Sequence, residues 1–276
     1  MATKKAASSA KKTTKKSTNA TKVTTVKAVE SRPMAASTTA VMNKFSLKNS
    51  SAVSALIAEF IGTFALAAAI VAGQGQPIIV LFALVGVVLT VGVLSGAYVN
   101  PALTIAAWVT RRITGMRAVG YIVAQFLGAM LALTLLEMFV KASPAPAADA
   151  ASMYSSAPTL FQASAIPQAK EWLVFLAELV GASIFGFAVA GATREIKERT
   201  AAAFTVGLGA FLGLMLAGSA AAFIGGTSIL NPAVAVTLKA ISFGSMWPVL
   251  VYVIGASLGA IIGFVLHDLL RSAENK

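Results

Sequence analysis

Six long apolar segments, separated by short polar connections, dominate the chain after residue 50. Each holds about 20 residues, the length of α-helix that crosses a hydrocarbon layer of ~30 Å. They cover residues 52–73, 77–96, 117–140, 171–191, 201–223 and 246–269. This pattern predicts an all-α membrane protein with six transmembrane helices.

Two shorter apolar stretches follow the second and fifth segments, and both begin with the same tripeptide. The first starts at Asn100-Pro101-Ala102 and ends at about Arg111; the second starts at Asn231-Pro232-Ala233. Asn is a favoured helix N-cap, and Pro suits the first helical position. A helix of about 11 residues is only ~16 Å long. Each stretch therefore predicts a helix that crosses half of the membrane.

The two tripeptides belong to an internal repeat. They lie 131 residues apart, and at the same offset Tyr121 matches Tyr252 and Gly128 matches Gly259; upstream, Glu59 matches Glu178 at an offset of 119. Repeat one covers residues 51–141 and repeat two residues 170–270. Because each repeat holds three spans, the second copy is inserted upside down, and the two half-helices meet near the midplane. Irregular backbone at that depth must be buried in protein or line a watery cavity.

The remaining residues form tails. Residues 1–50 carry eleven lysines and arginines against one glutamate, with few large apolar side chains, so we expect a disordered segment. Weak attraction to anionic lipid or to nucleic acid is an alternative role for it. Most other basic residues flank the spans on the same side as this tail, which predicts that both termini are cytoplasmic. Residues 271–276 form a short C-terminal tail, which leaves 51–270 as the membrane domain.

Composition argues against an enzyme or a metalloprotein. The chain has no cysteine and one histidine, and only 12% of its residues are charged. Thiolate and polyhistidine metal sites are therefore excluded, and the one candidate pair of carboxylates for acid–base catalysis, Glu59 and Glu178, lies in different repeats. We expect no cofactor and no bound metal.

Two Asn-Pro-Ala half-helices in a six-span inverted repeat resemble the aquaporin, or major intrinsic protein, family. The stretches Ala58-Glu59-Phe60-Ile61-Gly62 and Tyr121–Ala129 agree with that family's first and third helices. The resemblance implies a homotetramer in the lipid bilayer with one pore per subunit. It also implies that Asn100 and Asn231 donate N–H groups to water at the pore centre, where two helix N-termini give a positive potential that disfavours cations.

Two intramembrane carboxylates, Glu59 and Glu178, have two interpretations. A carboxylate at membrane depth is ordinarily a proton or ion site. The resemblance implies instead that each accepts backbone N–H bonds from the loop that leads to a half-helix, and that Gln125 also holds such a loop. We favour this structural role.

The narrowest part of the pore departs from the family pattern. The family usually has Arg directly after the second Asn-Pro-Ala, where this chain has Val234. Ungapped spacing gives Val80, Ser219 and Ser228 as the other filter positions, with Thr227 replacing Ser228 if Leu230 is an insertion. A filter without Arg, His or an aromatic side chain predicts a wider and less polar constriction.

These features predict a passive channel for water and small uncharged solutes in the plasma membrane. The alternatives are a glycerol, urea or ammonia facilitator with little water selectivity, a secondary transporter that couples ions through Glu59 and Glu178, and a closed-pore junction or scaffold protein. Each makes a different use of the same fold.

Overall fold

The computed structural model describes residues 38–143, 159–194, 198–242 and 244–274, and the side chains from residue 51 onward. The chain divides into two units, Met1–Asn43 and Lys44–Lys276, and the second holds all six candidate spans. The predicted disordered tail lies largely outside the described residues. Helix α1 (Thr38–Ala72) begins inside the predicted tail, where no Gly or Pro interrupts residues 38–50, and its candidate span begins at Ser51.

Helix is the only regular secondary structure of the described residues, which contain no strand. Six helices are long and apolar enough to cross a membrane, and their bounds agree with the predicted segments to within a few residues. After α1 these are α2 (Pro77–Ser95), α4 (Gly115–Ala142), α5 (Glu171–Ala192), α6 (Arg199–Ala222) and the sixth span, Trp247–Ala273. The sixth span joins α8 (Trp247–Val249), the π-helical turn η1 (Leu250–Gly255) and α9 (Ala256–Glu274).

Two short helices follow α2 and α6, as the repeated tripeptide predicts. Helix α3 (Pro101–Val109) has nine residues and α7 (Pro232–Thr237) has six. At ~1.5 Å per residue, neither spans more than half of the hydrocarbon layer. In both, Pro occupies the first helical position, where its missing N–H costs no hydrogen bond.

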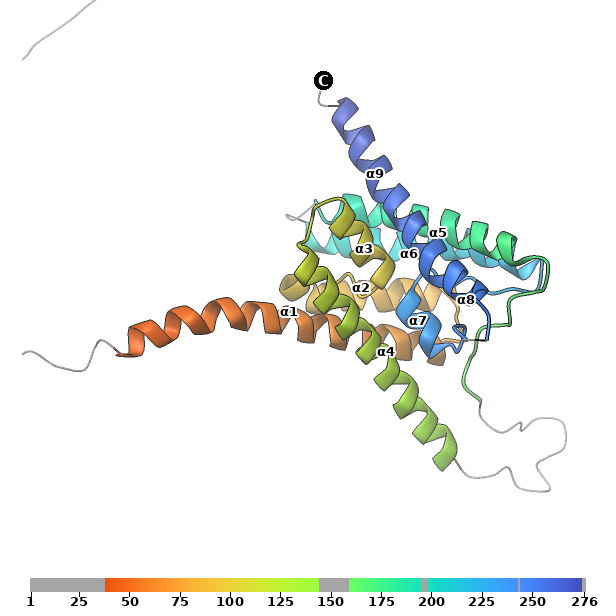
Figure 1. The fold of residues 1–276 in the computed structure, drawn as a ribbon, viewed down its shortest axis with the longest axis horizontal. Coiled ribbons are helices and arrows are strands. Elements are labelled where there is room, and N and C mark those ends of the chain that lie inside the picture. The colour runs from red at the N-terminus through yellow and green to blue at the C-terminus, as the bar shows by residue number, and fades with distance from the viewer. Residues whose placement is uncertain (1–37, 144–158, 195–197, 243, 275–276) are drawn as a thin grey trace, which may run out of the picture. The chain divides into compact units, whose positions relative to one another are not determined.

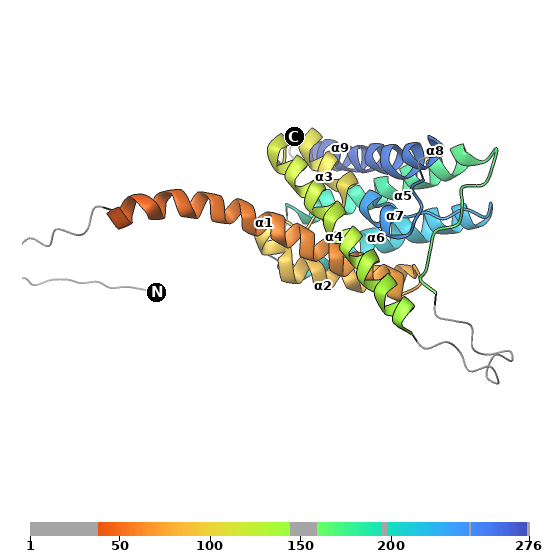
Figure 2. The ribbon, with the colours of Figure 1, turned by 60° about the horizontal axis from the view of Figure 1, so that its bottom comes forward.

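Each short helix packs against the last span of the other repeat. Helix α3 contacts α9, and α7 contacts α4, while α5 packs on both α6 and α9 and α2 packs on α6. The ribbon views show α3 and α7 near each other among the long helices (Figure 1; Figure 2). These contacts, between a short helix of one repeat and the last span of the other, hold the two repeats together.

Glycines set the distance between the first and third span of each repeat. A Cβ on Gly128 of α4 would collide with the carbonyl oxygen of Phe60 on α1, and a Cβ on Gly259 of α9 would collide with that of Leu179 on α5. Phe60 and Leu179 are themselves equivalent positions of the repeat. Both repeats therefore cross the same pair of helices at the same point of close backbone approach.

We expect Gly259→Ala to lower the free energy of unfolding by about 2 kcal/mol, because backbone at this crossing has no rotamer with which to move aside. Thermal unfolding in detergent measures the change. Gly86→Ala on α2 is the matched control, since its Cβ meets no atom within 4 Å. A melting temperature that falls equally in both variants would show that helix crossing is not what the glycine provides.

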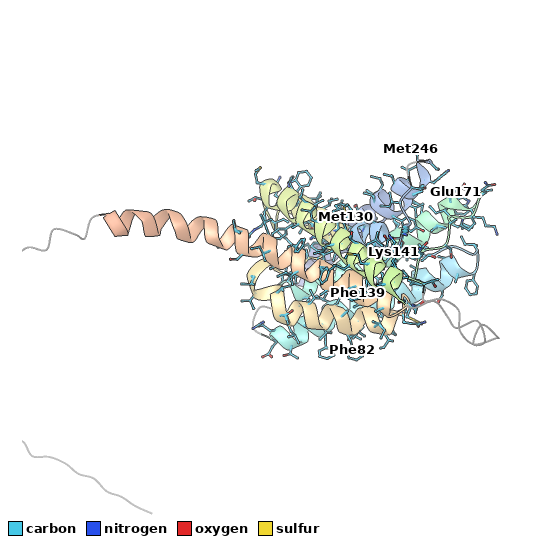
Figure 3. The ribbon with its side chains drawn as sticks, turned by 90° about the horizontal axis from the view of Figure 1, so that it is seen from below. Phe82, Met130, Phe139, Lys141, Glu171 and Met246 are labelled. Carbon is cyan, nitrogen blue, oxygen red and sulfur yellow. The ribbon has the colours of Figure 1, made fainter. Side chains whose placement is uncertain are left out.

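The outer surface of the second unit is apolar. Figure 3 shows Phe82, Met130 and Phe139 on the outside of their helices, and 58%, 53% and 73% of these residues are exposed. Buried positions hold alanines, larger apolar residues and a few polar ones, among them Glu59, Gln125 and Glu178. An apolar exterior around a core with buried polar groups is the arrangement expected of a protein surrounded by lipid.

Candidate functional site

The two asparagines that cap the short helices are linked across the repeats. Asn100 Oδ1 accepts a hydrogen bond from Ala102 N at 2.8 Å, and Asn231 Oδ1 accepts one from Ala233 N at 3.0 Å. Asn100 Nδ2 donates to Leu230 O at 2.9 Å, and Asn231 Nδ2 donates to Val99 O at 3.0 Å. Each amide therefore caps its own helix and braces the loop of the other repeat. Because an amide NH2 has two hydrogens, one donor remains on each asparagine.

Glu59 and Glu178 hold the backbone just before each asparagine. Glu59 accepts from Tyr98 N at 3.0 Å and Val99 N at 2.7 Å; Glu178 accepts from Ile229 N at 2.5 Å and Leu230 N at 2.9 Å. Both carboxylates are fully buried. Buried backbone donors need partners, and these loops have no helix or sheet to supply them. The carboxylates provide those acceptors at equivalent positions of the two repeats.

The two loops also share their backbone conformation. Val99 and Leu230, the residues before the asparagines, have positive φ values of 41° and 61°. Tyr121 Oη donates to Ser95 O at 2.8 Å, and its repeat equivalent Tyr252 donates to Thr227 O at 3.1 Å. Leu230 therefore matches Val99 both in conformation and in its hydrogen bond to a glutamate.

The third donor to each carboxylate differs between the repeats. In repeat one, Gln125 Nε2 donates to Glu59 at 2.7 Å and to Thr104 Oγ1 at 2.9 Å. In repeat two, Ser228 Oγ donates to Glu178 at 2.9 Å. The Ser228 hydroxyl hydrogen is therefore used within the protein. Sequence reasoning did not identify Thr104, although a hydroxyl four residues after a helix cap is a signal for a bond to the Asn100 carbonyl, which Thr104 makes at 2.9 Å.

Two cavities lie at the loops that precede the short helices. One, of about 410 Å³, is lined by Ser95, Gly96 and Tyr98 of the first loop together with residues of α2 and α6. The other, of about 370 Å³, is lined by Gly226, Thr227 and Ser228 of the second loop together with Ser219 of α6. Each cavity adjoins the loop that precedes one asparagine, and neither Asn100 nor Asn231 is among the lining residues.

The predicted filter residues separate into two groups. Ser219 and Ser228 line the second cavity. Val80 and Val234 do not line it; they are 5% and 0% exposed and belong to the apolar core beside Val99 and Leu103. The structure therefore brings the two serines together at one cavity and leaves the two valines in the apolar core.

An ionic cluster that sequence reasoning missed holds the end of α3. Arg112 donates to Asp268 Oδ1 at 2.8 Å, Ala190 O at 2.9 Å and Thr193 Oγ1 at 2.6 Å, and Arg194 donates to the same Asp268 oxygen at 2.9 Å. Partial burial lowers the pKa of Arg112 and Asp268 opposes the shift, so the guanidinium stays charged. The signal for this cluster in the sequence was Asp268, an acid near the end of the last apolar segment.

Among the described residues no group of three His, Cys, Asp or Glu side chains could hold a metal ion.

Tyr98, which lies two residues before Asn100 and lines the first cavity, is a further residue that the sequence analysis did not select.

Comparison with known proteins gives one family. Residues 74–267 match the family described as Major intrinsic protein. An aquaporin, AqpM, from Methanothermobacter marburgensis is 29% identical over 200 residues, which cover 69% of this chain and 74% of that protein. A glycerol uptake facilitator protein-like 6 from Lactiplantibacillus plantarum is 39% identical over 95 residues, which cover 31% of this chain and 44% of that protein.

A solved structure shares the fold. The X-ray structure of the aquaglyceroporin from Plasmodium falciparum is similar with a TM-score of 0.56 and 19% identity, covering 82% of this chain and all of that chain.

Proposed function

The chain belongs to the major intrinsic protein family of passive channels for water or small solutes, and we propose that it conducts water together with small uncharged solutes past a constriction without a fixed cation. The proposal is supported by membership of this channel family and by the two linked asparagines, each of which keeps one N–H donor. It further includes a homotetramer in the plasma membrane, with both termini in the cytoplasm and residues 51–270 as the channel domain.

The observation that carries the solute range is Val234. This residue lies three positions after Asn231 in α7 and is fully buried. With Val80 it makes one part of the proposed constriction apolar, while Ser219 and Ser228 supply hydroxyl groups at the mouth. A passage lined in this way offers hydrogen bonds without a charge. Uncharged solutes larger than water, such as glycerol, urea or ammonia, are therefore the proposed co-substrates.

The asparagine pair supports water passage through the same route. Each amide keeps one N–H after its cross-repeat bond, and the short helices direct two N-termini toward the region between the loops. Donors and a positive potential at one level orient water oxygens toward it and disfavour cations. This role of Asn100 and Asn231 is part of the proposal.

Stopped-flow light scattering on proteoliposomes tests the solute range. We expect rapid shrinkage in an impermeant osmolyte and rapid glycerol entry, and we expect Val234→Arg to slow glycerol entry at least about tenfold while water flux persists. The added guanidinium narrows the passage and introduces N–H donors, which water satisfies more readily than the larger glycerol does. Persistent water flux also shows that the variant is folded.

Val234→Leu is the matched control, because it adds bulk without charge or N–H donors. We expect it to slow glycerol less than the arginine does. Water flux without glycerol entry in the unmodified protein would contradict the wide constriction, and the absence of both from folded protein would contradict the open channel.

A further inference from the structure

A basic pocket at the turn between α3 and α4 has no part in the proposed channel. Its volume is about 610 Å³. It is lined by Trp108, Arg111, Arg112, Ile113, Thr114, Gly115 and Arg117. Three of these seven residues are arginines and none is acidic. A concave site with this charge attracts anions.

Two of the arginines are available to a ligand. Arg112 is engaged by Asp268, Ala190 and Thr193, as described above. Arg111 and Arg117 are exposed and, within the described part of the chain, form no ion pair; the guanidinium of Arg117 lies over the face of Tyr121, 5.7 Å from the ring centroid. The pocket therefore has one arginine fixed at its base and two guanidinium groups free to bind.

The backbone around the pocket is built by a tight turn. Arg111 has a φ of 59°, and its N–H donates to Trp108 O while that of Arg112 donates to Ala107 O, which ends α3. Thr114 then caps α4, and its Oγ1 accepts from Arg117 N. Gly115, the first residue of this 28-residue helix, lines the pocket, so the positive end of the α4 dipole adds to the arginines.

An apolar strip continues from the pocket along α4. Met116, Val119, Val123, Leu127 and Met130 follow one another at spacings of three or four residues and are each at least 53% exposed. Met130 lies on the outside of the helix in Figure 3. Trp108, half exposed at the pocket, is a residue that prefers the boundary between headgroups and acyl chains. A basic pocket followed by an apolar strip has the same order as the headgroup and acyl chain of a phospholipid.

We propose that this pocket binds the phosphate headgroup of an anionic phospholipid, whose acyl chain lies along the exposed face of α4. Arg111 and Arg117 contact the phosphate, and Trp108 lies at the level of the glycerol backbone. Basic pockets at the ends of transmembrane helices recognise anionic headgroups through the same combination of charge and interfacial position. A soluble phosphate uses the arginines but gains nothing from the strip.

Tryptophan fluorescence tests the proposal, since the chain has three tryptophans. In the full chain carrying Trp172→Phe and Trp247→Phe, Trp108 is the only tryptophan that remains. The protein is reconstituted in phosphatidylcholine vesicles that contain either brominated phosphatidylglycerol or brominated phosphatidylcholine, with bromine near the top of the acyl chain. We expect at least about fivefold tighter association of the anionic lipid with Trp108, the effect of one favourable arginine near a membrane surface.

Arg111→Gln with Arg117→Gln is expected to bring quenching by the two brominated lipids to equality, with unchanged water flux. Arg199→Gln is the matched control, since Arg199 lines the neighbouring cavity and donates to Leu89 O. It removes one of the two charges that the double substitution removes, at a position outside the pocket, and is expected to leave the preference intact. The basic tail is present in every variant, so its general attraction is the same in all of them. Equal quenching in the starting protein, or a preference that survives the double substitution, would overturn the proposal. Loss of the preference in millimolar inorganic phosphate would show a soluble-phosphate site and refute the lipid assignment.

Discussion

Replacing Glu178 with glutamine is expected to lower the free energy of unfolding by about 3 kcal/mol and to abolish channel activity. Glu178 divides three donors between its oxygens: Ser228 Oγ and Ile229 N on Oε1, and Leu230 N on Oε2. A glutamine has one acceptor oxygen, so either orientation leaves an NH2 group opposite a backbone N–H. A buried donor without a partner costs about 1–3 kcal/mol, and two opposed donors add repulsion. The loop that carries Asn231 loses its anchor.

Thermal unfolding in detergent, together with water flux in proteoliposomes, measures this effect. Glu59→Gln should act in the same direction, because Tyr98 N and Val99 N also bind different oxygens of one carboxylate. Glu137→Gln is the matched control at a partly exposed acid that pairs with Lys239. Its loss should lower the melting temperature much less than Glu178→Gln does, because a solvent-screened ion pair contributes little to stability. A Glu178→Gln protein with unchanged stability that has lost proton- or sodium-dependent uptake would instead support a secondary transporter.

The helices were predictable from sequence because the membrane allows few alternatives. A segment such as 171–191 must satisfy its backbone internally, so its apolar length alone fixes α5 to within a residue. The half-helices were predictable for a different reason: Asn followed by Pro fixes where a helix begins. The equivalence of Glu59 and Glu178 followed from the repeat.

The contacts between the repeats were not predictable in the same way. The offset of the two asparagines shows that they are equivalent, but the bonds from Asn100 to Leu230 and from Asn231 to Val99 depend on the separation of the two loops. The use of Ser228 by Glu178 depends on a side-chain rotamer, so spacing assigned it to the filter alone. The Arg112–Asp268 pair joins residues 156 positions apart through the packing of α3 on α9.

Replacing Asn231 with aspartate should have the largest effect on selectivity. The carboxylate keeps the cap to Ala233 N, but it has no hydrogen to donate to Val99 O and introduces a negative charge. The two half-helix N-termini together supply at most about one positive charge, which a single aspartate offsets. We expect Asn231→Asp to raise the leak of protons or potassium at least about tenfold and to reduce water flux, measured with a pH-sensitive dye under a potassium diffusion potential.

Asn231→Ser separates the charge from the lost bond. Serine retains a capping oxygen and also loses the amide donor to Val99 O, but it leaves the potential of the helix ends positive. If the positive potential at the asparagine pair excludes cations, the serine variant should leak no more ions than the unmodified protein while its water flux falls. Only the aspartate variant should then leak ions. Equal ion leaks in both variants would show that ions are blocked because the hydrogen bond to Val99 O keeps the two loops packed together. An aspartate variant as tight as the unmodified protein would place the exclusion of cations elsewhere along the pore.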